Sequence, residues 1–245
     1  RQCRSWISCN ANNTGPWDTQ INVPLRPDGY PVEIPYSNGV NLPQKVKTLL
    51  MWDLFSATPV GTFRLKSSGT GQIRLLNGAV GTYTSPCDTL IPVTGEIILE
   101  ILVSDLNDPI HDVRFILPDY VNTYQSKTFT DELLDFLSDF QVIRFMDFTR
   151  TNASPVVSWS DRTMPDHYSQ AGNGGVAWEY AIQLANTAHK DVWINIPHMA
   201  DDAYLDSLAH LMQDDLDPAL KVYLEFSNEV WNGGFSQHAD CAQLA

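Results

Sequence analysis

The stretch EFSNEVWN places an amide, a carboxylate and an indole directly after an apolar run. Val222 to Phe226 are largely apolar, and Asn228, Glu229 and Trp231 follow within a few residues. A strand that only fills a core has no use for a carboxylate beside an amide, because both must be hydrated, paired or used in function. Two interpretations of Glu229 stay open at this point. It either caps the next helix or pairs with a surface lysine, or it is a catalytic acid.

Polar residues also follow two earlier apolar segments of the chain. Asp147 lies near the end of QVIRFMDF, and His198 follows DVWINIP. Each residue stands where a strand is expected to end, as Asn228 and Glu229 do after LKVYLEF. Polar residues at the carboxyl ends of parallel strands are typical of the active sites of (β/α)8 barrels.

The second half of the chain alternates between strand and helix patterns. Strands are expected at 111–118, 141–148, 191–197 and 220–226, and helices at 129–140, 174–190 and 201–216. Apolar strands that alternate with helices predict a parallel sheet covered by helices, which both doubly wound sheets and barrels contain. The polar strand ends favour the barrel. No G-x-G-x-x-G or G-x-x-x-x-G-K-[ST] stands at a strand-to-helix turn, which argues against a nucleotide-binding doubly wound sheet.

The first half reads differently, as short β-segments separated by Gly, Pro and Asn at intervals of roughly ten residues. We therefore expect a sandwich-like all-β accessory domain at 1–108 and an α/β domain at 109–245. From Ile110 the chain has 136 residues, whereas a full barrel needs about 250. The expected fold is thus an incomplete (β/α)8 barrel of about four β-α units, whose C-terminal half belongs to a longer product.

Composition limits the partners. The 245 residues carry a formal net charge of −14, which disfavours nucleic acid and anionic membranes as partners. No apolar run reaches the ~20 residues of a membrane span. Cys3, Cys9, Cys87 and Cys241 have no metal-type spacing. We expect no metal and no cofactor, and a Cys3–Cys9 disulfide stays open.

EFSNEVWN resembles the end of the fourth strand in clan A glycoside hydrolases, which are retaining (β/α)8 enzymes. The resemblance implies that Glu229 is the general acid/base and that Asn228 holds the sugar 2-hydroxyl. VIRFMDFTRTN resembles the second strand of these enzymes, and Arg144 would support the nucleophile. That nucleophile is a Glu on a seventh strand, which this chain lacks, so the chain by itself is expected to be inactive. Glu225 is interpreted as structural, with Arg144 or Arg114 as its partner.

The resemblance implies a carbohydrate substrate, a β-glycan in particular, and an exported protein in the extracellular space or periplasm. His198, Asp147, Trp231 and Trp159 are then candidate sugar contacts, since aromatic rings stack on sugar C–H faces. Each also has a structural interpretation, as a satisfied loop residue or a local anchor. Two rival functions remain: a carbohydrate-binding protein or pseudoenzyme without catalysis, and a metal-dependent hydrolase. The second would use Asp147, His198 and Asp201, but the chain lacks the histidine pair that is usual on one strand of such enzymes.

Overall fold

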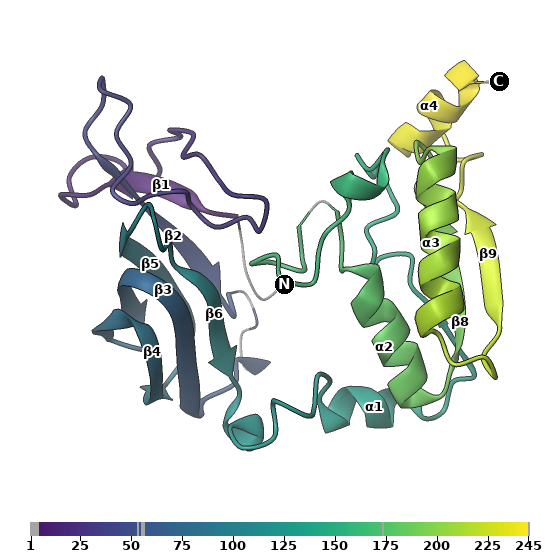
Figure 1. Ribbon diagram of the computed structural model, residues 1–245, viewed down its shortest axis with the longest axis horizontal. Helices are drawn as coiled ribbons and strands as arrows, with labels where there is room; N and C mark the ends of the chain where they lie inside the picture. The colour runs from purple at the N-terminus through teal and green to yellow at the C-terminus, as the bar shows by residue number, and fades with distance from the viewer. Residues whose placement is uncertain (1–4, 53, 55–56, 173, 245) are drawn as a thin grey trace. The chain divides into compact units, whose positions relative to one another are not determined.

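The computed structural model describes residues 5–52, 54, 57–172 and 174–244. The chain divides into two compact units (Figure 1). Unit 1 comprises Arg1–Thr128 with Asp166–Ser169, and unit 2 comprises Phe129–Pro165 with Gln170–Ala245. The main division therefore follows Thr128, later in the chain than the boundary at residues 108 and 109 that the sequence suggested. No described helix is both long enough and apolar enough to cross a membrane.

Unit 1 is built on one six-stranded antiparallel sheet. Its strands are β1 (Ile7–Asn10), β2 (Gln44–Leu50), β3 (Gly61–Asn77), β4 (Gly81–Val93), β5 (Ile97–Ser104) and β6 (His111–Ile116). The order is β1-β2-β5-β3-β4, and β6 pairs with the first half of β3. Alternate residues of these strands point to one face and form an aliphatic core. Its fully buried members include Leu65, Ile73, Leu75, Ile97 and Ile101.

The opposite face of this sheet carries a buried charged row. Lys47 on β2 and Arg74 on β3 both stand beside Glu100 on β5 in the strand register. Lys45 also reaches Glu100, with its Nζ 2.8 Å from Oε1. The side chains of Lys45 and Glu100 are only 3% and 6% exposed. A carboxylate at the centre of the row offsets the cost of burying the cations.

Unit 2 is a three-stranded parallel sheet with helices between its strands. In chain order its elements are α1 (Asp131–Leu137), β7 (Val142–Arg144), η3 (Trp159–Asp161), α2 (Trp178–Ala188), β8 (Asp191–Ile196), α3 (Asp202–Asp215), β9 (Val222–Phe226) and α4 (Ser236–Leu244). The strand order is β7-β8-β9. Thr130 caps α1, and Asp201 caps α3 by accepting a hydrogen bond from the Tyr204 amide. Val192, Ile194 and Ile196 of β8 share a buried core with α2 and α3.

The expectation of a (β/α)8 barrel is wrong. The described parallel strands number three, and they do not show the repeat of a barrel. β6, which the sequence assigned as the first barrel strand, instead pairs antiparallel with β3 in unit 1, with Arg64 opposite Ile116. Its residues alternate between more and less exposed positions, which suits an antiparallel strand more than a strand covered on both faces. The sandwich expectation is also wrong, because the described strands of unit 1 form one connected sheet rather than two packed sheets.

Candidate active site at the carboxyl end of the parallel sheet

The candidate site lies on the sheet face that α2 and α3 do not cover. Arg144, Trp193 and Tyr223 stand side by side in the register of β7, β8 and β9. Because side chains alternate along a strand, this row and Glu225 point away from the face that carries Val192. The Trp193 and Tyr223 rings lie 6.5 Å apart and are 39% and 44% exposed. The face is therefore polar and aromatic, and it is accessible.

Arg144 connects two of the residues that the sequence singled out. Its Nη2 donates to both carboxyl oxygens of Glu225, at 3.1 and 2.8 Å, and its Nε donates to Oε2 at 3.2 Å. The same Nη2 lies 3.0 Å from the Asn228 Oδ1, which accepts from it. Trp193 Nε1 donates to Glu225 at 2.8 Å. Arg144 is thus the partner of Glu225, the first of the two partners expected for it.

Glu225 remains a charged partner in this arrangement. Partial burial is the largest single influence and raises the pKa of its carboxyl. The hydrogen bonds and charge of Arg144, with hydrogen bonds from Asn195 and Trp193, hold the pKa below its ordinary value. A carboxylate that is bound by a guanidinium and an indole is not free to attack a substrate. The structure therefore supports the structural interpretation of Glu225.

Asn228 is buried, with 4% of its surface exposed. Besides the bond to Arg144, its Nδ2 donates to the Asn152 Oδ1 at 3.0 Å. The residues on either side of it have left-handed backbones, with φ of 54° at Ser227 and 44° at Glu229. Non-glycine residues seldom adopt this conformation, and it is enriched at functional sites. Asn195 supports the turn, because its Nδ2 donates to the Ser227 carbonyl at 2.7 Å.

Glu229 carries its carboxyl on the surface. Its Oε2 accepts a hydrogen bond from Asn232 Nδ2 at 2.9 Å. The next helix begins at Ser236, seven residues later, so Glu229 does not cap it. No lysine of the described chain pairs with this carboxylate. Both structural interpretations of Glu229 therefore lack support.

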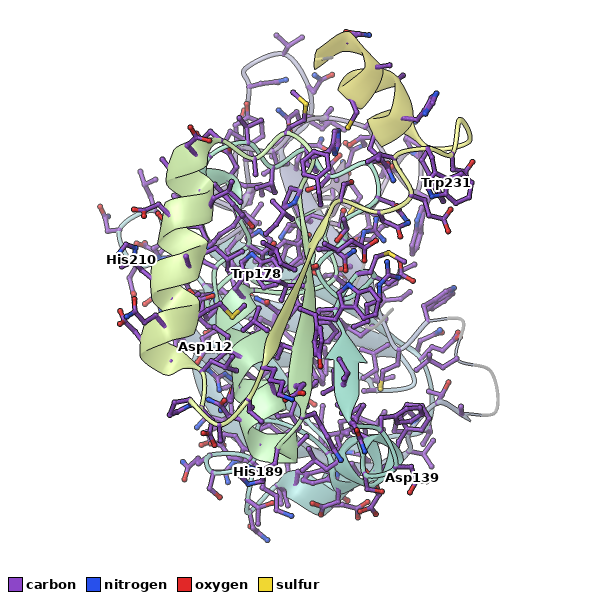
Figure 2. All side chains as sticks on the ribbon, turned by 90° about the vertical axis from the view of Figure 1, so that its right-hand side faces the viewer. Asp112, Asp139, Trp178, His189, His210 and Trp231 are labelled. Carbon is purple, nitrogen blue, oxygen red and sulfur yellow. The ribbon has the colours of Figure 1, made fainter. Side chains whose placement is uncertain are left out.

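The other predicted contacts are divided between the site and the core. Trp231 is 74% exposed and lies in the turn between β9 and α4 (Figure 2). Trp159 is half-buried, packs edge-on against the Tyr204 ring at 5.2 Å and has the Arg162 guanidinium 3.9 Å above it. It serves as a local anchor of η3. Asp147 is exposed in the loop after β7, and the structure gives its side chain no contact with the site.

His198 is 5% exposed and does not face solvent. Its Nε2 lies 2.8 Å from the Asp240 Oδ2 on α4. Its Nδ1 is buried and has no hydrogen-bond partner among the described residues. Of the four other described atoms in this state, the Asn195 Oδ1 and the Ser227 Oγ lie at this end of the sheet, whereas the Arg162 Nε and the Glu179 Oε2 belong to the η3–α2 region. The carboxyl end of the sheet therefore contains polar groups whose hydrogen-bonding capacity the described chain does not use.

Sequence reasoning missed several residues of this region, three of them outside the sheet. Asn152, Gln237 and Asp240 all bond to predicted site residues. Gln237 is fully buried near the start of α4, which is an unusual place for an amide side chain. The burial of Gln237 can be recognised only when the buried face of α4 is known.

The metal-dependent alternative gains no support from the geometry. Asp201 caps α3, and His198 is paired with Asp240. Over the ranges that the structure describes, no three His, Cys, Asp or Glu side chains gather in a way that would hold a metal ion. Cys9, Cys87 and Cys241 carry free thiols, while Cys3 lies outside the described residues.

No protein-family model, curated protein or solved structure matches the chain. The function is therefore inferred from the chemistry of the site itself.

Proposed function

We propose that the chain supplies the acid/base part of a retaining glycoside hydrolase site that acts on a β-glycan. One observation carries the proposal. A buried Asn228 is held between Arg144 and Asn152, and the next residue presents an exposed carboxyl from left-handed backbone. Such backbone costs free energy that a purely structural turn, with glycine available, does not need to spend.

Asn228 is suited to hold a sugar hydroxyl. Its Oδ1 accepts from Arg144 and one of its N–H groups donates to Asn152. The second N–H has no partner within the described chain, so it is the group that would donate to a sugar hydroxyl oxygen. Because an amide is neutral, it orients the sugar without adding charge beside the acid.

Glu229 is assigned as the general acid/base. Its exposed carboxyl is accessible to a glycosidic oxygen, to which it would transfer a proton as the C1–O bond breaks. Trp231 offers an exposed aromatic face for the C–H side of a neighbouring sugar ring. A retaining site also needs a nucleophilic carboxylate, and we assign this role to no residue of the chain, because Glu225 is bound by Arg144 and Trp193. A polysaccharide substrate would be met outside the cytoplasm, in the extracellular space or periplasm.

An external nucleophile allows the acid to be tested without the second carboxylate. The protein is incubated with phenyl β-glycosides of glucose, mannose and xylose, whose basic leaving group needs a proton, with and without sodium azide. Azide forms a C1–N bond as the C1–O bond breaks, and Glu229 gives its proton to the leaving oxygen. We expect azide-dependent release of phenol that Glu229→Gln lowers by about 10²-fold or more, the range of general acid catalysis.

Glu132→Gln is the matched control, because Glu132 is an exposed glutamate on α1. It should leave the release of phenol unchanged. Release that is equal in the wild type and in Glu229→Gln, or absent from the wild type on every glycoside, contradicts the assignment.

Carbohydrate binding without catalysis is the second candidate. Two observations favour it: Trp231 is exposed, and no residue of the chain is assigned as the nucleophile. Affinity electrophoresis in gels that contain β-glucan, mannan or xylan separates the two functions. Retardation by one glycan, together with no azide-dependent release, would identify a binding protein and contradict the hydrolase.

A further inference from the structure

Gln237 is a fully buried glutamine on α4 with three hydrogen bonds to distant segments. Its Oε1 accepts from the Ala153 amide at 3.1 Å. Its Nε2 donates to the Asn152 Oδ1 at 2.7 Å and to the Asn228 carbonyl oxygen at 2.8 Å. The Asn152 Oδ1 therefore accepts two bonds, from Gln237 and from Asn228. We name Asn152, Asn228 and Gln237 the amide triad.

The amide triad is not explained by packing alone. A leucine or methionine at position 237 would fill a similar volume without the cost of burying a polar group. That cost is offset only when the bonds are made, and here three of the four hydrogen-bonding positions of Gln237 are used. A buried polar network of this kind fixes one geometry, because any displacement leaves polar atoms unpaired.

The bonds of the triad fall on strained backbone. Ala153 has φ of 53°, and Ser227 and Glu229 on either side of Asn228 have φ of 54° and 44°. None of these residues is glycine, so each conformation must be held by its surroundings. Gln237 bonds to the amide of the first and to the carbonyl that lies between the other two. It thus ties the loop after β7 to the turn after β9.

We propose that Gln237 is a positioning residue for Asn228 and Glu229. It holds the Asn228 side chain so that the Oδ1 faces Arg144 and one N–H remains for a ligand, and it holds the turn that presents Glu229. The expected effect of Gln237 on turnover rests on the proposed function. The positioning of the Asn228 amide does not, and it can be measured directly.

The direct test follows the side-chain amide protons of Asn228 by NMR in the full chain. Gln237→Met keeps the length of the side chain and removes all three bonds. We expect hydrogen exchange of the Asn228 side-chain amide to accelerate by about tenfold or more, the scale of one lost buried hydrogen bond, and its resonances to shift. Gln243→Met is the matched control, because Gln243 is an exposed glutamine on the same helix. Equal exchange in Gln237→Met and the wild type overturns the inference.

Gln237→Glu keeps the test decisive if Gln237→Met folds poorly. A carboxylate still accepts from the Ala153 amide but cannot donate to Asn152 or Asn228. Protonation restores a donor, so the Asn228 resonances should return toward their wild-type positions as the pH is lowered. Resonances in Gln237→Glu that already match the wild type at neutral pH overturn the inference.

The kinetic test separates this inference from the proposed function. In the azide assay, Gln237→Met should lower kcat by about tenfold and change KM less, because it displaces Glu229 more than the aromatic contacts. A wild type without turnover contradicts the proposed function, and the exchange of Asn228 then still decides the positioning. An active wild type with unchanged kcat in Gln237→Met overturns the positioning role.

Discussion

Two polar clusters occupy comparable places in the two units, each on the sheet face opposite an aliphatic core. In unit 1, Glu100 accepts from Lys45 at 2.8 Å and from the Nε of Arg74 at 2.6 Å. In unit 2, Glu225 accepts from Arg144 at 2.8 Å. The first ion pair is nearly closed to solvent, whereas the side chains of Arg144 and Glu225 are 36% and 28% exposed.

The difference teaches how a structural network can be told from a candidate site. In unit 1, Asn13 completes the cluster by accepting from both Lys45 and Arg74. The left-handed backbone of Asn13 costs little, because asparagine tolerates it. In unit 2, the cluster is bordered by strained non-glycine residues, an exposed carboxyl and buried polar atoms that have no partner in the described chain. Unused bonding capacity together with strain indicates function.

The largest expected effect is on the cluster around Glu100 in unit 1. Glu100→Gln leaves Lys45 and Arg74 without their carboxylate in a buried position, which should lower the free energy of unfolding of unit 1 by about 3–5 kcal/mol. Chemical denaturation followed by the tryptophans of each unit would measure it, with unit 2 as the internal reference. Asp88→Asn is the control, since Asp88 pairs with Arg64 and Lys66 on the surface. Because this pair is solvent-screened, Asp88→Asn should lower stability far less than Glu100→Gln does. Equal midpoints for Glu100→Gln and the wild type would mean that the charged row is not structural.

For the cluster around Glu225 in unit 2, we expect a small loss of stability and a large loss of turnover. Arg144→Met removes a partly exposed ion pair, so the free energy of unfolding of unit 2 should fall by about 1–2 kcal/mol, less than in Glu100→Gln. Turnover in the azide assay should fall by about tenfold or more, because Asn228 loses the donor that fixes its Oδ1. Arg114→Met, in unit 1, is the matched control. If Arg144→Met loses stability and keeps its turnover, the cluster around Glu225 is structural and not part of a site.

Local sequence signals accounted for the elements of unit 2. The helix expected at 129–140 forms as α1 with Thr130 as its cap, and the segments read as strands at 141–148, 191–197 and 220–226 contain β7, β8 and β9. Apolar periodicity and caps are local, so they can be read from a window of residues. The partner of β6 could not be read this way. Its pairing with β3 joins Ile116 to Arg64, and no local pattern encodes that distance.

The candidate site was predictable to the same extent. Arg144 and Asn228 were both singled out as candidate site residues, and the structure joins them at 3.0 Å. Gln237 bonds to Asn152, which is 85 residues earlier in the chain. Such a contact depends on tertiary packing that propensities do not describe. The left-handed backbone at Ser227 and Glu229 was not predicted either, because the residue types on their own do not indicate it.

The smallest expected effect is the pH dependence of stability. It can be compared for one ion pair in each unit. Hydrogen bonds from Arg64 chiefly hold the pKa of Asp88 at about 2, below its ordinary 3.8. The pKa of Glu225 is also lowered from 4.5, where burial opposes the bonds from Arg144 and Trp193. A depressed carboxyl pKa stabilises the folded state above the unfolded pKa, and this contribution is lost as the pH falls through the folded pKa.

The stability difference between the wild type and Glu225→Gln should therefore be constant above about pH 4.5 and shrink on further acidification. Carboxyl NMR titrations of both residues check the prediction, and thermal unfolding between pH 7 and pH 3 measures the difference. A difference that grows on acidification would show that Glu225 is strained by its surroundings and not stabilised by Arg144.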